Sequence, residues 1–96
     1  MTSVRLTIRN PSGLHARPAA TFVRTAGRFA ASISVRNVAS DRPPADAKSI
    51  LGVMTLGVER GHEIELTASG EDAEAAIASL REAVESGLGE ALEPSP

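Results

Sequence analysis

The sequence contains no cysteine, which excludes a disulfide framework and any site built on a thiolate. Its two histidines, His15 and His62, are 47 positions apart and have no spacing typical of metal ligands, so we expect no bound metal. Tryptophan and tyrosine are absent and phenylalanine occurs only twice. Because stacking platforms for single-stranded bases are therefore missing, we do not expect nucleic acid as the partner.

Long apolar runs are also absent, and no stretch approaches the length needed to span a membrane. The first residues, Met1 to Leu6, alternate between polar and apolar types and lack the continuous apolar core of a signal peptide. We therefore expect a cytoplasmic protein without membrane insertion. With 96 residues, of which 42% are hydrophobic and 23% charged, the chain fits one soluble globular domain.

The charges are unevenly distributed along the chain. Residues 1–48 carry eight Arg or Lys against two acids (+6), whereas residues 49–96 carry two Arg against ten acids (−8), which sums to the net charge of −2. Such asymmetry indicates a basic face suited to an acidic partner or to phosphate.

A single histidine stands where a strand-like segment gives way to a helical one. Residues 10–13 (Asn-Pro-Ser-Gly) are typical of a turn, and Pro18 is tolerated in a helix only in the first turn. A helix should therefore begin at about His15 or Ala16, which places the imidazole beside the unpaired N–H groups and positive dipole end of that helix. Such a position favours phosphate. A histidine at a helix start can equally be only a polar cap, and spacing alone does not separate the two interpretations.

Hydrophobic periodicity predicts the remaining elements. Alternation predicts strands at residues 2–9, 32–38 and 62–69, and helical spacing predicts helices at residues 16–28, at 50–56 after a Ser49 cap, and after an Asp72 cap to about residue 87. Residues 39–46 contain two prolines, which permit at most a short edge strand. The resulting order, β-α-β-β-α-β-α, indicates an α+β fold with helices on one face of the sheet.

Charges on the wet faces of the strands suggest the strand order. The last strand offers Glu63 and Glu65, and the first two offer Arg5, Arg9 and Arg36. An acidic strand between two basic ones would pair opposite charges across both seams. A ferredoxin-like arrangement remains the structural alternative at this point.

Three motifs occur in order along the chain: Gly13-Leu14-His15-Ala16-Arg17-Pro18-Ala19, Lys48-Ser49-Ile50-Leu51-Gly52-Val53-Met54-Thr55-Leu56-Gly57 and Glu65-Leu66-Thr67-Ala68-Ser69-Gly70-Glu71-Asp72-Ala73. Together they resemble the family of the histidine-containing phosphocarrier protein HPr of the phosphoenolpyruvate-dependent sugar phosphotransferase system. The resemblance covers about residues 2–89 and implies an open-faced β-sandwich, in which three helices pack on one face of a four-stranded antiparallel sheet of order 1-4-2-3. We expect one domain at residues 1–89 and a flexible tail at residues 90–96. The segment before Ser49 is about three residues longer than the usual pattern.

The same resemblance implies a phosphocarrier that needs no cofactor. His15 would accept a phosphoryl group on Nδ1 from phospho-enzyme I and pass it to the A domain of a sugar-specific enzyme II. The backbone N–H groups of Ala16 and Arg17, together with the Arg17 guanidinium, would hold the phosphate. Two alternatives stay open: a related carrier serving a dihydroxyacetone kinase or nitrogen regulation, and a binding module in which His15 is only a cap.

Further residues are candidates for docking and regulation. On a helix that continues to residue 28, Arg17, Arg24 and Arg28 form one basic stripe, either a docking surface or a solvated face. Ile50, Leu51 and Met54 are core residues by default, whereas the resemblance implies that part of this group docks partners. Ser49 matches the serine that an HPr kinase/phosphorylase modifies in some bacteria. His62 has no surrounding motif, and we interpret it as a surface or strand-edge residue.

Overall fold

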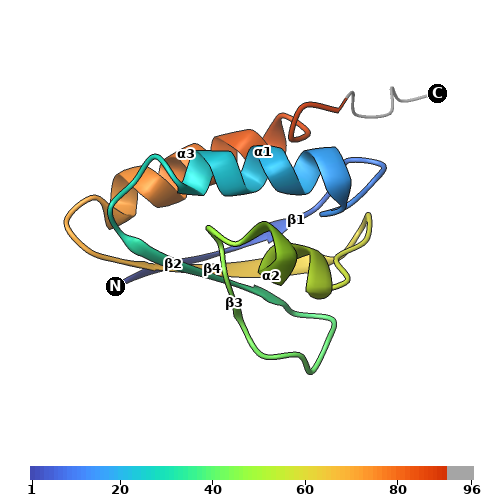
Figure 1. Ribbon diagram of the computed structural model, residues 1–96, viewed down its shortest axis with the longest axis horizontal. Helices are drawn as coiled ribbons and strands as arrows, with labels where there is room; N and C mark the ends of the chain where they lie inside the picture. The colour runs from blue at the N-terminus through green and yellow to red at the C-terminus, as the bar shows by residue number, and fades with distance from the viewer. Residues whose placement is uncertain (91–96) are drawn as a thin grey trace.

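Four antiparallel strands form one sheet in the order β1-β4-β2-β3, and α1 and α3 lie side by side over one of its faces (Figure 1). The structure is a computed structural model that describes residues 1–90. α2 packs against α1 and β3. The elements in chain order are β1 (Thr2–Thr7), α1 (Ala16–Ala26), β2 (Ser32–Asn37), β3 (Ala45–Asp46), α2 (Ile50–Thr55), β4 (Glu63–Ser69) and α3 (Ala73–Glu85). The predicted fold class and strand order are confirmed.

Alternating side chains explain why β1, β4 and β2 form a sheet with one dry face. Leu6 pairs with Ile64 and Val35 pairs with Leu66, so apolar residues meet on the helix-covered side. On the open side Glu65 lies between two arginines: its carboxylate is 3.3 Å from Arg5 Nε and 3.3 Å from Arg36 Nη2. The charge pairing predicted across both seams is therefore present. The hydrogen bond from Arg5 lowers the pKa of Glu65 most, and the hydrogen bond from Arg36 lowers it further.

The proline-containing segment at residues 39–46 ends in a short edge strand, which the sequence permitted but did not predict. β3 has two residues, with Ala45 opposite Val35 and Asp46 opposite Ser34. Pro43 and Pro44 come directly before it, where a missing N–H interrupts no central ladder. The connection between β2 and β3 projects from the rest of the domain in Figure 1.

Helix ends differ from the expectations in two places. α1 ends at Ala26 rather than near Arg28, because Gly27 is its C-cap and glycine is a poor helix former. Asp72 stands at the N-cap of α3, but its side chain makes no capping hydrogen bond; its carboxylate instead accepts the N–H groups of Ala30 and Ala31 at 2.9 and 2.8 Å. Asp72 therefore ties the segment after α1 to the start of α3.

The core lies between the sheet and the helices. Its largest fully buried apolar side chains come from all layers of the fold: Phe22, Ile8, Leu14, Ile64, Leu66, Leu80, Leu88, Val35, Val53, Val58 and Val84. Leu14 is completely buried although it directly precedes His15. The core therefore anchors the chain immediately before the candidate site. Within residues 1–90, no helix is long and apolar enough to cross a membrane.

Candidate functional site

His15 stands at the junction between a tight turn and α1. The turn is closed by the Gly13 N–H, which donates to Asn10 O at 3.2 Å, and the Leu14 N–H donates to Val58 O at 3.0 Å. His15 is the N-cap residue of α1, with extended backbone angles (φ −116°, ψ 151°), yet its side chain makes no capping hydrogen bond. The ring is 42% exposed. The imidazole is thus held at a helix N-terminus without being used as a cap.

The first turn of α1 has an unusual backbone. Ala16 has a positive φ of 44°, a left-handed conformation that costs a non-glycine residue about 1–2 kcal/mol. Pro18 lies in the first turn and is buried, as its missing N–H allows. The N–H groups at this end have no acceptor within the helix, and together with the helix dipole they favour an anion.

A shallow hollow of about 480 Å³ opens beside the imidazole. The exposed Arg17 also lines it, so an arginine and the histidine share one concave surface. Its lining residues are Pro11, Ser12, His15, Ala16, Arg17, Pro18, Gly89 and Glu90. The structure therefore brings together His15, Ala16 and Arg17, which we selected from the sequence, with the chain that follows α3.

Glu90 braces the turn that precedes His15. Its Oε1 accepts the Ser12 N–H and the Asn10 side-chain amide, each at 3.0 Å, and its Oε2 accepts the Ser12 hydroxyl at 2.8 Å. The hydrogen bond from the Asn10 side-chain amide lowers the pKa of Glu90 most. The hydrogen bonds from Ser12 and the positive charge of Arg17 lower it further. We expected residue 90 to begin a tail, and the rest of that tail lies outside the described residues. The chain is therefore bonded to the site at least as far as Glu90.

The lowered pKa of Glu90 predicts a pH dependence of stability. Because the carboxylate is more acidic in the folded chain than in the unfolded one, its contribution is complete above the unfolded pKa and is lost as pH falls through the folded pKa. When the pH falls below the ordinary pKa range of glutamate, Glu90→Gln should therefore lose less thermal stability than the parent. Thermal midpoints of both proteins across that range measure this effect. Parallel curves would contradict the prediction, and Glu74→Gln, at an exposed position of α3, serves as the control.

The segment after β3 places Ser49 and its apolar neighbours at the surface. Ser49 caps α2 as predicted: its hydroxyl accepts the Gly52 N–H at 3.1 Å. Ile50 is 41% exposed and Leu51 75% exposed, whereas Met54 is half-buried against the core. The core residue of this helix is Val53. Ile50 and Leu51 therefore form an exposed apolar surface on a helix that packs against α1.

The predicted arginine stripe is shorter than expected. Arg17 and Arg24 both lie on α1 and are exposed, but α1 ends before Arg28. Arg28 instead lines a small hollow between the end of α1 and α3, together with Glu82. The helical projection that aligned all three arginines therefore applies only to Arg17 and Arg24.

Two acids near His15 were not identified from the sequence. Glu90 bonds the turn before His15, and the Glu59 carboxylate lies 3.6 Å from Nε2 of His15. Glu59 belongs to the turn before β4, in which the His62 N–H donates to Glu59 O at 3.0 Å. His62 is half-buried, and its Nδ1 accepts the Glu59 N–H at 3.1 Å. No local motif marks either acid, because both reach the site only through tertiary packing.

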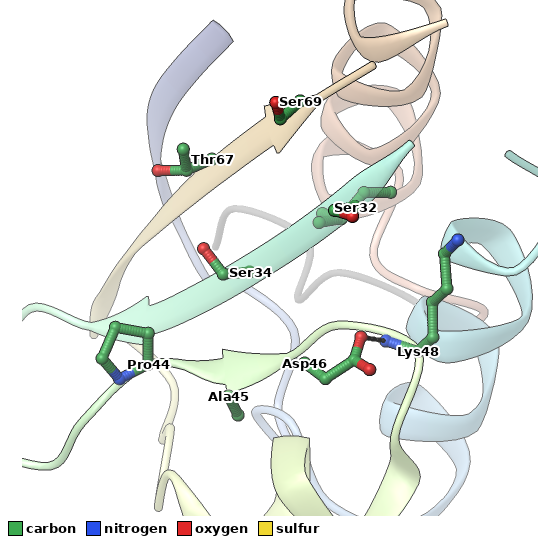
Figure 2. Close-up of a pocket in the computed structure, with 9 residues that line it drawn as sticks. Ser32, Ser34, Pro44, Ala45, Asp46, Lys48, Thr67 and Ser69 are labelled. Atoms are coloured by element: carbon green, nitrogen blue, oxygen red, sulfur yellow. Dashed lines mark hydrogen bonds between the residues drawn. The ribbon is translucent and has the colours of Figure 1, made fainter. Parts of the chain in front are cut away.

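Another hollow, of about 460 Å³, lies on the open side of the sheet and contains none of the residues selected from the sequence. Figure 2 shows hydroxyl side chains from β2 and β4 along its floor, with Asp46 and Lys48 at one border. The Lys48 N–H donates to Asp46 Oδ1 at 2.9 Å. Because this hollow holds no histidine and no helix N-terminus, the site at α1 remains the candidate for phosphate chemistry.

Comparisons with known proteins identify the family of the chain. A family profile described as "PTS HPr component phosphorylation site" matches residues 2–86. The multiphosphoryl transfer protein of Salmonella typhimurium is 42% identical over 88 residues, covering 92% of this chain but only 23% of the relative's length. The HPr-like protein Crh of Bacillus subtilis is 40% identical over 80 residues, which cover 83% of this chain and 91% of Crh.

A solved structure gives the same result at the level of the fold. The crystal structure of HPr from Thermoanaerobacter tengcongensis superimposes with a TM-score of 0.88 at 47% identity, covering 96% of this chain and all of that one. A profile that matches most of the chain, close sequence relatives and a near-identical fold thus coincide with a histidine exposed at the start of α1. The chain therefore belongs to the HPr family.

Proposed function

We propose that His15 is the residue that carries the phosphoryl group, accepting it on Nδ1 from phospho-enzyme I and passing it to the A domain of a sugar-specific enzyme II in the cytoplasm. The observation that carries this proposal is the half-exposed imidazole at the N-terminus of α1, which makes no capping hydrogen bond. The domain that performs this transfer comprises residues 1–89, with Glu90 bracing its turn.

The phosphate is held by charge and by backbone donors rather than by an enclosed pocket. The N–H groups of Ala16 and Arg17 lie in the first turn of α1, and Arg17, whose guanidinium can bond phosphate oxygens, lines the same hollow as His15. Phosphoryl transfer depends mainly on positioning and charge stabilisation. An open hollow suits a carrier, because the donor and the acceptor must each reach the same nitrogen atom.

Partners dock on the surface around the site. We propose that Arg17, Arg24 and Arg28 attract acidic partner surfaces, with Arg28 acting from beyond the end of α1. Ile50 and Leu51, with part of Met54, supply the apolar contact. A basic surface around an apolar contact raises association rates and leaves a water-excluding centre.

Ser49 is the site that we propose for regulation by an HPr kinase/phosphorylase. Its hydroxyl lies directly before Ile50 and Leu51, so a phosphate there would place negative charge beside the proposed docking surface. The charge would have to be desolvated against a partner, and it would repel an acidic one. Modification also replaces the hydroxyl that caps α2, and an anion is well placed at that helix end.

Two substitutions separate the capping role of Ser49 from the regulatory one. Ser49→Ala removes the acceptor of the Gly52 N–H and should lower the free energy of unfolding by about 1 kcal/mol. Its phosphorylation rate by enzyme I should stay near that of the parent. Ser49→Asp also caps, so it should keep most of the stability but transfer slowly. Thermal midpoints and initial phosphorylation rates measure both, and equal transfer rates in the two variants would leave Ser49 as a cap only.

The direct test of the function is a two-step transfer. The chain is incubated with enzyme I and labelled phosphoenolpyruvate, and the labelled chain is then separated and mixed with an enzyme IIA domain. We expect acid-labile, base-stable label on the chain and its loss to the IIA domain. A chain that takes no label, or that keeps it in the second step, would contradict the proposal.

A further inference from the structure

Glu59 lies against the one nitrogen of His15 that does not take part in the proposed bond to phosphorus. Its Oε2 is 3.6 Å from Nε2 of His15, and the side chains are 67% and 42% exposed, respectively. On the basis of the proposed function above, we propose that Glu59 is a positioning residue that keeps the His15 proton on Nε2. The Nδ1 lone pair is then free to attack phosphorus. The Glu59 carboxylate also balances the positive charge of the phosphorylated ring.

The backbone that carries Glu59 is fixed against the turn that carries His15. Val58 O accepts the Leu14 N–H at 3.0 Å. The approach is so close that a Cβ at Gly13 would stand 2.3 Å from Val58 O and 2.9 Å from Glu59 Cα. The two turns are therefore in direct backbone contact, and the carboxylate starts from a defined position beside the ring.

His62 holds the same backbone from the other direction. Its Nδ1 accepts the Glu59 N–H at 3.1 Å and lies 3.4 Å from the Asn37 side-chain amide. Because both of these groups are donors, Nδ1 of His62 carries no proton in this arrangement. The His62 side chain thus bonds the backbone of the turn, and the Glu59 side chain is left free to face His15.

The chemistry of transfer explains what a carboxylate at Nε2 contributes. A neutral imidazole carries one proton, so a free lone pair on Nδ1 requires the proton on Nε2. When Nδ1 bonds to phosphorus, the bond from phosphorus to its donor breaks and that electron pair leaves with the donor. The ring keeps its Nε2 proton and becomes positively charged, next to the negative Glu59. In the second step the electrons of the P–N bond return to the ring, which becomes neutral again as the acceptor takes the phosphoryl group.

Other charges also act on the ring, and the test must leave them unchanged. Arg17 and Glu90 line the hollow beside His15, on elements different from the turn that carries Glu59. Glu59→Gln keeps the size of the side chain and removes only its charge. Glu71→Gln is the matched control, because Glu71 is an exposed acid beside Ala30 and Ala31, beyond the far end of α1. Glu59→Asp retains the charge and tests rescue.

Two measurements on the whole chain test the proposal. Nitrogen NMR of ¹⁵N-histidine protein, above about pH 8 where an ordinary imidazole is neutral, reports which ring nitrogen of His15 holds the proton. Glu59→Gln should raise the share of the form protonated on Nδ1, and its initial phosphorylation rate by enzyme I should fall about tenfold, which corresponds to about 1.4 kcal/mol of transition-state stabilisation. Glu59→Asp should lie closer to the parent, and Glu71→Gln should match it.

The outcomes separate this inference from the proposed function. An unchanged tautomer ratio in Glu59→Gln overturns the positioning role, and so does a transfer rate equal to or above that of the parent. The same NMR spectra show whether the variant is folded. If the parent chain takes no label at all, the proposed function fails, while the tautomer measurement still reports whether Glu59 orients the ring.

Discussion

The His15→Ala variant is expected to fold like the parent and to accept no phosphoryl group from enzyme I and phosphoenolpyruvate. Its side chain is partly exposed and makes no capping hydrogen bond, so its removal should change the free energy of unfolding by no more than about 0.5 kcal/mol. The nitrogen nucleophile of the proposed reaction is removed completely. Labelling with phosphoenolpyruvate and a thermal melt of the same sample measure the two effects.

The second histidine provides the matched control. His62→Gln should take up label to the same final extent as the parent, because His62 is half-buried and engaged with the turn before β4. It should be less stable by about 1 kcal/mol, since the Glu59 N–H loses its present acceptor. Acid-labile, base-stable label on His15→Ala would contradict the assignment of His15 as the acceptor.

Gly13→Ala should be the most destabilising change in the site, with a loss of about 3 kcal/mol from backbone strain and overpacking together. Gly13 has a φ of +60°, and an added Cβ would stand 2.3 Å from Val58 O and 2.9 Å from Glu59 Cα. Both close atoms belong to the backbone, so no side chain can rotate away. The turn before His15 and the turn before β4 would have to separate, and phosphoryl transfer should slow with them.

Gly57→Ala separates the two causes. Gly57 has nearly the same φ, +64°, but nothing lies within 4 Å of an added Cβ. It should therefore lose only the conformational part, about 1 kcal/mol. Denaturant unfolding of both variants gives the comparison. Equal losses would show that contact between the two turns contributes nothing at Gly13.

Local sequence patterns were sufficient to predict the features that depend on residues close together in the chain. The alternation of β1, β4 and β2 predicted which residues enter the core, and the turn before His15 together with Pro18 placed the start of α1 within one residue. The Ser49 cap followed from residue type and position. The strand order also had a signal in the sequence, because Glu65 could satisfy Arg5 and Arg36 at once only between their strands.

The surroundings of His15 depend instead on contacts between distant segments. Glu59 and Glu90 come 44 and 75 positions after it in the sequence, one from the turn before β4 and one from the chain after α3. Asp72 has the sequence position of a helix cap and bonds Ala30 and Ala31 instead. Periodicity and capping preferences describe hydrogen bonds over a few residues, whereas these carboxylates find their donors through the packing of the sheet and helices. The sequence by itself therefore determined the family, the fold and the position of the histidine, and the tertiary structure decided which charges meet its ring.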